Sequence, residues 1–137
     1  MLECLVLGDS IAVGVSQVRR ECVSLAKSGI NSSLWNRDYL PHAVDKNYQT
    51  VIISLGANDH KGVPTENELR RMRVNVSGKR VFWIDPGKNR KPIAHDAIMR
   101  IASQYGDTVI PRPQDQMSAD GVHPTGRGYR TLADQTR

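Results

Sequence analysis

Four short apolar runs constrain the fold of this chain more than any other feature. They span residues 4–7, 51–55, 81–84 and 108–110, and most of their members are β-branched or aromatic. Such runs are typical of strands that are covered on both faces, as in a parallel sheet. A weaker run at 22–25 predicts a fifth strand.

Helical patterns separate these runs. Residues 92–105 carry apolar side chains at helical spacing, from Ile93 to Tyr105, and predict a helix with one buried face. Further helices are expected at 11–18, at 65–76 and from Thr125 onward. The alternation of strand and helix predicts an α/β fold, a three-layer α/β/α sandwich around a five-stranded parallel sheet of flavodoxin-like order 2-1-3-4-5.

Length and composition predict one soluble, globular domain over residues 1–137. The chain is 39% hydrophobic and 24% charged, and no segment approaches the about 18 apolar residues that a membrane span needs. With no recognisable signal peptide, a cytoplasmic location is the default expectation, and release from the cell or association with a virion is left open. Cys4 and Cys22 are the only cysteines; free thiols are favoured over a disulfide, although neighbouring first and second strands would bring them close.

Positive charge is concentrated between residues 61 and 91. The chain has a net charge of +5, and this segment alone holds nine Lys and Arg against three acidic residues. A solvated surface is the simpler interpretation, and a contact with a polyanion is the alternative. Nucleic acid is not an expected partner, because no nucleic-acid motif is present and a single Phe offers no stacking platform.

Polar residues with catalytic chemistry follow the predicted strands. Ser10 comes directly after the first strand, and its hydroxyl needs a base to become a nucleophile. Asp120 and His123 are three residues apart, a spacing at which the carboxylate holds one imidazole nitrogen while the other faces outward. Pro124 favours an extended conformation at His123 and so presents it ahead of the last helix.

An oxyanion formed at such a serine needs hydrogen-bond donors. The candidates are the backbone N–H of Ser10, a backbone N–H near Gly29 and the side-chain amide of Asn58, which follows the strand at 51–55. Each donor of this kind contributes on the order of 3 kcal/mol in a dry site. In a sheet of order 2-1-3-4-5, Ser10 and Asn58 would flank the crevice at the switch point.

Four sequence blocks resemble those of the SGNH, or GDSL, hydrolase superfamily. They are residues 8–10 (Gly-Asp-Ser), Gly29, residues 56–59 (Gly-Ala-Asn-Asp) and residues 120–125, in the family's order and across nearly the whole chain. The resemblance implies that Ser10 is the nucleophile and an oxyanion donor, that Gly29 and Asn58 are the other donors, and that His123 is the base oriented by Asp120. The chain is short for this superfamily, and its very short members resemble bacteriophage products.

The resemblance implies a serine esterase that works through an acyl-enzyme. The short chain leaves little room for an acyl-binding wall, which favours acetyl esters on a carbohydrate or a bacterial envelope polymer. Three alternatives remain: a lysophospholipase or thioesterase, a non-catalytic module that binds an acidic glycan, and a flavodoxin-like phosphate binder. No cofactor or metal is expected, since the histidines lack ligand spacing.

Overall fold

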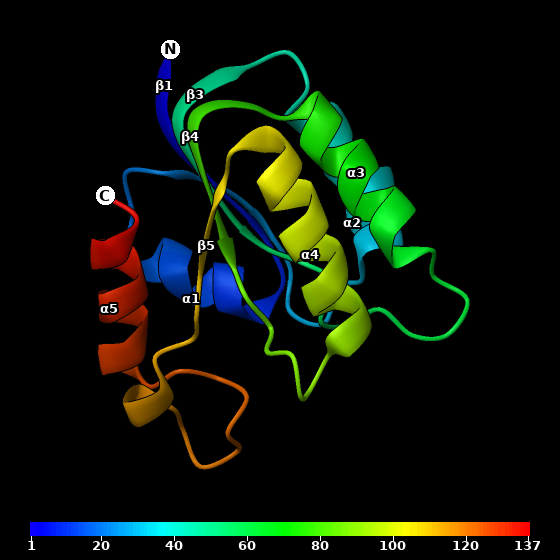
Figure 1. The fold of residues 1–137 in the computed structure, drawn as a ribbon. Coiled ribbons are helices and arrows are strands. Elements are labelled where there is room, and N and C mark those ends of the chain that lie inside the picture. The colour runs from blue at the N-terminus through cyan, green and yellow to red at the C-terminus, as the bar shows by residue number, and fades with distance from the viewer.

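A five-stranded parallel sheet forms the middle layer of the protein (Figure 1). The computed structural model describes residues 1–137. Its strands are β1 (Leu2–Gly8), β2 (Val23–Ala26), β3 (Asn47–Ser54), β4 (Ser77–Ile84) and β5 (Thr108–Ile110). They lie in the order β2-β1-β3-β4-β5, and every neighbouring pair is parallel. The predicted fold class and strand order are confirmed.

Helices cover both faces of the sheet (Figure 1). One face carries α1 (Ser10–Val18) and α5 (Gly126–Gln135), and the other carries α2 (Ser32–Asp38), α3 (Thr65–Asn75) and α4 (Pro92–Tyr105). Single 3-10 turns occur at Leu40–His42 and Gln114–Gln116. None of these helices combines the length and hydrophobicity needed to cross a bilayer.

The two faces of the sheet explain why the strands are continuously apolar in sequence. Successive side chains of a strand point to opposite faces. In β1, Leu5 and Leu7 join the core under α2, α3 and α4, while Val6 joins the core under α1 and α5. All three side chains are completely buried. A polar residue at any of these positions would lie in one core or the other.

Helix α4 has the predicted bounds but a narrower buried face than predicted. Ala97, Ile98 and Ile101 are buried against the sheet. Ile93 is 75% exposed and Tyr105 is 38% exposed, so their prediction as core residues is wrong. Ile93 lies at the edge of the apolar stripe, and in the same turn it is the neighbouring Ala94 that is buried.

The two cysteines form a disulfide, which corrects the expectation of free thiols. Val23 pairs with Leu5 in the register of β1 and β2, and this places the preceding Cys22 beside Cys4 with a Cα–Cα distance of 4.7 Å. The register, which the sequence alone does not reveal, therefore decides the pairing.

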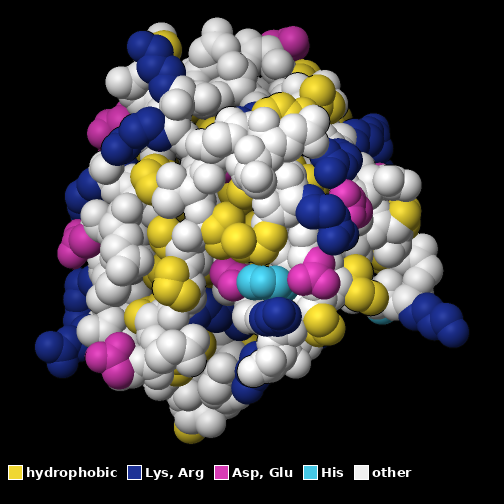
Figure 2. Space-filling model, in the orientation of Figure 1, with side chains coloured by type: hydrophobic (Ala, Val, Ile, Leu, Met, Phe, Trp, Pro, Cys, Tyr) yellow, Lys and Arg dark blue, Asp and Glu magenta, His cyan; other side chains and the backbone are white.

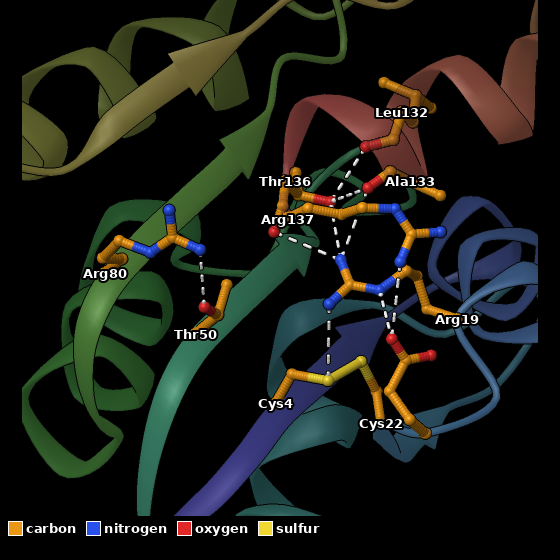
Figure 3. The surroundings of a disulfide bond; sticks show 10 residues. Cys4, Arg19, Cys22, Thr50, Arg80, Leu132, Ala133, Thr136 and Arg137 are labelled. Carbon is orange, nitrogen blue, oxygen red and sulfur yellow. Dashed lines mark hydrogen bonds and ion pairs between the residues drawn. A yellow bond between two sulfur atoms is a disulfide. The ribbon is translucent and has the colours of Figure 1, made fainter.

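Buried Arg19 connects this disulfide to the end of α5 (Figure 3). Its Nη2 lies 3.7 Å from Cys4 Sγ, and its Nη1 donates to the carbonyl oxygens of Ala133 and Thr136 at 3.4 and 3.2 Å. Because the last carbonyls of a helix have no partners within it, Arg19 satisfies the carboxyl end of α5 and fixes this helix against β1.

Removal of the disulfide is expected to destabilise the fold without changing it. The bond closes a loop between residues 18 apart in sequence, and the chain-entropy model assigns such a loop about 3 kcal/mol. Urea denaturation of the Cys4→Ala/Cys22→Ala variant should show a free energy of unfolding lower by about this amount. Dithiothreitol should weaken the wild-type protein and leave the variant unaffected; equal midpoints for the two proteins would contradict the prediction.

Candidate active site

Ser10 is placed by a sharp turn between β1 and α1. Gly8 has a φ of +130°, and a Cβ at this position would lie 1.7 Å from the carbonyl oxygen of Ser54, so only glycine fits. The N–H of Asp9 donates to that same oxygen at 2.8 Å. The chain therefore passes from β1 into α1 directly over the end of β3, and Ser10 becomes the first residue of the helix.

Asp9 caps this helix from a buried position. Its carboxylate accepts hydrogen bonds from the N–H of Ile11 at 3.1 Å and from the hydroxyl of Ser54 at 2.8 Å. Burial raises the pKa of Asp9, while these hydrogen bonds and the positive charge of Arg112 oppose the rise. The cap holds the first turn of α1. Because Ser10 is the first residue of this helix, its N–H has no acceptor within the helix.

Ser10 and His123 lie in direct contact although 113 residues separate them. Ser10 Oγ is 2.9 Å from His123 Nε2, and His123 Nδ1 is 2.7 Å from a carboxylate oxygen of Asp120. When Nδ1 carries the hydrogen and donates to Asp120, Nε2 is free to accept the hydroxyl hydrogen of Ser10. The three side chains thus form one hydrogen-bonded chain.

The loop before α5 holds Asp120 in its charged form. One oxygen of its carboxylate accepts from the backbone N–H groups of Val122 and His123 at 2.8 and 2.9 Å, and from the Ser118 hydroxyl at 2.8 Å. The hydrogen bond from the His123 side chain, followed by these, holds the pKa of Asp120 well below its usual range. Asp120 is half exposed, so its orientation depends on these hydrogen bonds and not on packing.

Arg112 supports the same loop from the interior of the protein, a role that the sequence analysis did not predict. Its Nη1 donates to the carbonyl oxygen of Val122 at 2.8 Å, and the residue is only 7% exposed. The one sequence signal for it is its place two residues beyond the carboxyl end of β5, between two prolines.

The three candidate oxyanion donors lie on adjoining loops at the carboxyl ends of β1, β2 and β3. The N–H of Lys27 donates to the carbonyl of Gly8 at 2.9 Å, which holds the turn at Gly29 beside the start of α1. Gly29 has a φ of +79° and its N–H has no acceptor. Asn58 Nδ2 donates to the carbonyl of Ile30 at 3.2 Å, which ties the loop after β3 to this turn.

A second aspartate–histidine pair lies at the carboxyl end of β4. Asp85 and His95 Nδ1 are 2.8 Å apart, and Asp85 also accepts from the N–H of Gly87 at 3.0 Å. The face drawn in Figure 2 carries basic and acidic side chains in close mixture, with one histidine in contact with acidic neighbours. No hydroxyl group hydrogen-bonds to this pair, so it holds the loop between β4 and α4 and lacks the nucleophile that Ser10 offers to His123.

The carboxyl group of Asp120 is expected to titrate well below an ordinary aspartate. A lowered pKa means that the charged carboxylate stabilises the fold above the unfolded-state pKa of about 3.9, and that this contribution is lost as the pH falls through the folded-state pKa. Carbon-13 NMR of the carboxyl group measures the titration. In His123→Ala the pKa should rise only partway, because the backbone N–H donors remain; a wild-type titration at or above the ordinary value would contradict the assignment.

Comparisons with known proteins support the fold. No family model matches the sequence, and no curated protein matches it. Among solved structures, a GDSL-like lipase from Bacteroides thetaiotaomicron is 17% identical, with a TM-score of 0.67 over 97% of this chain and 84% of that one. A psychrotrophic esterase from Pseudoalteromonas is 17% identical, with a TM-score of 0.60 over 98% and 94%. A carbohydrate acetylesterase family member from Sinorhizobium meliloti is 12% identical, with a TM-score of 0.62 over 96% and 94%. The chain therefore has the fold of GDSL-like lipases and esterases.

Proposed function

We propose that this chain is a serine ester hydrolase of the SGNH (GDSL) type that removes acetyl or similarly small acyl groups from a carbohydrate. The observation that carries the proposal is the hydrogen-bonded chain from Ser10 through His123 to Asp120. Its polarity is that of a nucleophile, a general base and an orienting carboxylate. The shared fold with esterases adds support.

In the proposed reaction, His123 Nε2 takes the hydroxyl proton of Ser10 while Ser10 Oγ attacks the ester carbonyl. The negative charge that develops on the carbonyl oxygen is stabilised by the N–H groups of Ser10 and Gly29 and by the Asn58 amide. The Asp120 carboxylate stabilises the imidazolium that forms. His123 then gives its proton to the leaving alcohol oxygen, the carbon–oxygen bond breaks, and the acyl group stays on Ser10.

Water completes the cycle by the reverse sequence. His123 takes a proton from a water molecule, whose oxygen attacks the acyl carbonyl under the same three donors. Collapse of this second intermediate releases the acid and returns the proton to Ser10 Oγ. No metal ion or cofactor takes part in these steps.

The open surroundings of the site favour a small acyl group. The side chains of His123 and Asp120 are 42% and 51% exposed. The cavity that adjoins Asn58 and Val122 has a volume of about 240 Å³ and is also lined by Arg90, Lys91 and Arg112. Charged walls of this kind suit a polar alcohol, such as a sugar, better than a lipid tail.

A carbohydrate of the bacterial envelope is the proposed target. The Sinorhizobium neighbour is a carbohydrate acetylesterase family member, and unpaired basic residues beside the site suit an acidic polymer. The disulfide between Cys4 and Cys22 suits an oxidising environment outside the cytoplasm. The proposal extends to a bacteriophage-type enzyme that acts on such a polymer.

One cavity favours a second candidate, a lysophospholipase or thioesterase. It has a volume of about 540 Å³ and lies beside the loop after β3, where Val63, exposed Ile93 and Ala94 form part of its wall. A pocket of this size is large enough for an acyl chain, which would lie against these apolar residues, while Arg90 and Lys91 also line the pocket.

Replacement of Ser10 by alanine is expected to lower the turnover of p-nitrophenyl acetate by at least about 10³-fold, because the acyl-enzyme cannot form. Circular dichroism should show an unchanged fold. Ser103→Ala, which removes an exposed serine of α4 that makes no side-chain hydrogen bond, is the matched control and should retain wild-type turnover. Undiminished hydrolysis by Ser10→Ala would refute the mechanism, and a wild-type protein inert toward every ester would support the glycan-binding alternative.

Acyl-chain length separates the two candidate substrates. We expect kcat/KM for p-nitrophenyl acetate to exceed that for the octanoate by at least about tenfold, because an open, charged site gains little from a longer chain. The measurement is initial-rate hydrolysis of acetate, butyrate and octanoate esters below their micellar concentrations. A rise in kcat/KM with chain length would instead support the lysophospholipase or thioesterase, with the acyl chain lying against Ile93.

A further inference from the structure

Buried Arg112 has more hydrogen-bonding capacity than its known contacts use. Its Nη1 binds the carbonyl of Val122, but its Nε is buried and has no partner, and its Nη2 makes no hydrogen bond. The residue is only 7% exposed, and it lines cavities on two sides. Support of the loop before α5 therefore accounts for only one of its donor groups.

Two further cations converge on the same place without an acidic partner. Arg90 and Lys91 line the 240 Å³ cavity together with Arg112, Asn58 and Val122. The guanidinium of Arg90 reaches the loop of the candidate base, since a Cβ on Gly121 would lie 2.9 Å from its Nη2. Neither Arg90 nor Lys91 makes an ion pair or a side-chain hydrogen bond.

The acidic residues near these cations are already engaged. Asp9 accepts from Ser54 and Ile11, Asp85 is paired with His95, and Asp120 is paired with His123. Asp9 and Asp85 attract Arg112 at a distance, while Arg90 repels it. Elsewhere in the basic segment, Arg70 and Arg73 form ion pairs with Glu66 and Asp107. Among the cations of this segment that have no ion pair, Arg90 and Lys91 lie at the candidate active site, whereas others, such as Arg71 of α3, lie elsewhere.

We infer that Arg90, Lys91 and Arg112 form an anion subsite, and that the substrate is an acylated sugar with a carboxylate or phosphate close to the ester. The inference rests on the proposed esterase function and names its substrate class. The cavity lies between Asn58, a proposed oxyanion donor, and Val122, next to His123. An anion bound there sits on the sugar that carries the ester or on its immediate neighbour. The volume of this cavity, about 240 Å³, is below the usual range for drug-sized ligands, about 300–1,000 Å³, and suits one charged group.

Arg90→Gln tests the subsite. We expect the ratio of kcat/KM for acetylated oligogalacturonate to that for acetylated xylo-oligosaccharide to fall about tenfold, the loss of one charge-assisted hydrogen bond to an anion. Added sodium chloride should shrink the wild-type ratio. Arg71→Gln, which removes an exposed, unpaired cation of α3, is the matched control and should leave the ratio within about twofold of wild type.

Inhibition of p-nitrophenyl acetate hydrolysis distinguishes the two anions. D-glucuronate or glucose 6-phosphate should inhibit more strongly than glucose at equal ionic strength, and whichever does so identifies the group that binds. If neither exceeds glucose, or if Arg71→Gln changes the ratio as much as Arg90→Gln does, the subsite is refuted.

A direct binding measurement separates failure of the subsite from failure of the esterase. Calorimetric titration of acetylated oligogalacturonate into Ser10→Ala, alone and combined with Arg90→Gln, needs no turnover. If Ser10→Ala binds the oligosaccharide and the added Arg90→Gln substitution abolishes that binding, the subsite is upheld even if the wild-type protein hydrolyses no ester. Equal binding by both proteins, or binding by neither, overturns it whether or not the esterase function holds.

Discussion

The close approach of Gly8 to Ser54 is the constraint on which the site depends. Because a Cβ at Gly8 would overlap the Ser54 carbonyl, the chain can leave β1 over the end of β3 only with glycine there. The next residue, Asp9, uses that carbonyl for its N–H and the Ser54 hydroxyl for its carboxylate. Ser10 is consequently held at the switch point of the sheet, where the loops after neighbouring strands converge.

Arg112 couples this turn to the distant loop that carries the candidate base. Burial lowers the pKa of Arg112, while the negative charges of Asp9 and Asp85 oppose that shift. The same guanidinium holds the Val122 carbonyl and lines the proposed anion subsite. One buried cation thus offsets the buried charge behind Ser10, supports the loop of His123 and lines the proposed subsite, so that the candidate nucleophile, the candidate base and the proposed anion subsite share one electrostatic unit.

Much of the fold was predictable because the strands are covered on both faces. Continuous apolar runs such as that of β1 have few alternatives to a central parallel strand, and the alternation with helices restricts the connections. The predictions for Cys4, Cys22 and Ile93 were wrong for physical reasons. The disulfide depends on the register between β1 and β2, and the exposure of Ile93 depends on how α4 is rotated on the sheet, since its first turn buries Ala94 and not Ile93.

For the site, the sequence by itself determined which chemical groups are present and the strand ends that they follow. Ser10, Asn58 and the pair Asp120 and His123 were recognisable because their spacing and flanking residues are local properties of the chain. Only the tertiary structure decided that Ser10 lies 2.9 Å from His123 and that Arg90 and Lys91 meet Arg112. Such contacts join segments far apart in the chain. Their geometry follows from strand register and loop packing, which no single stretch of the sequence specifies.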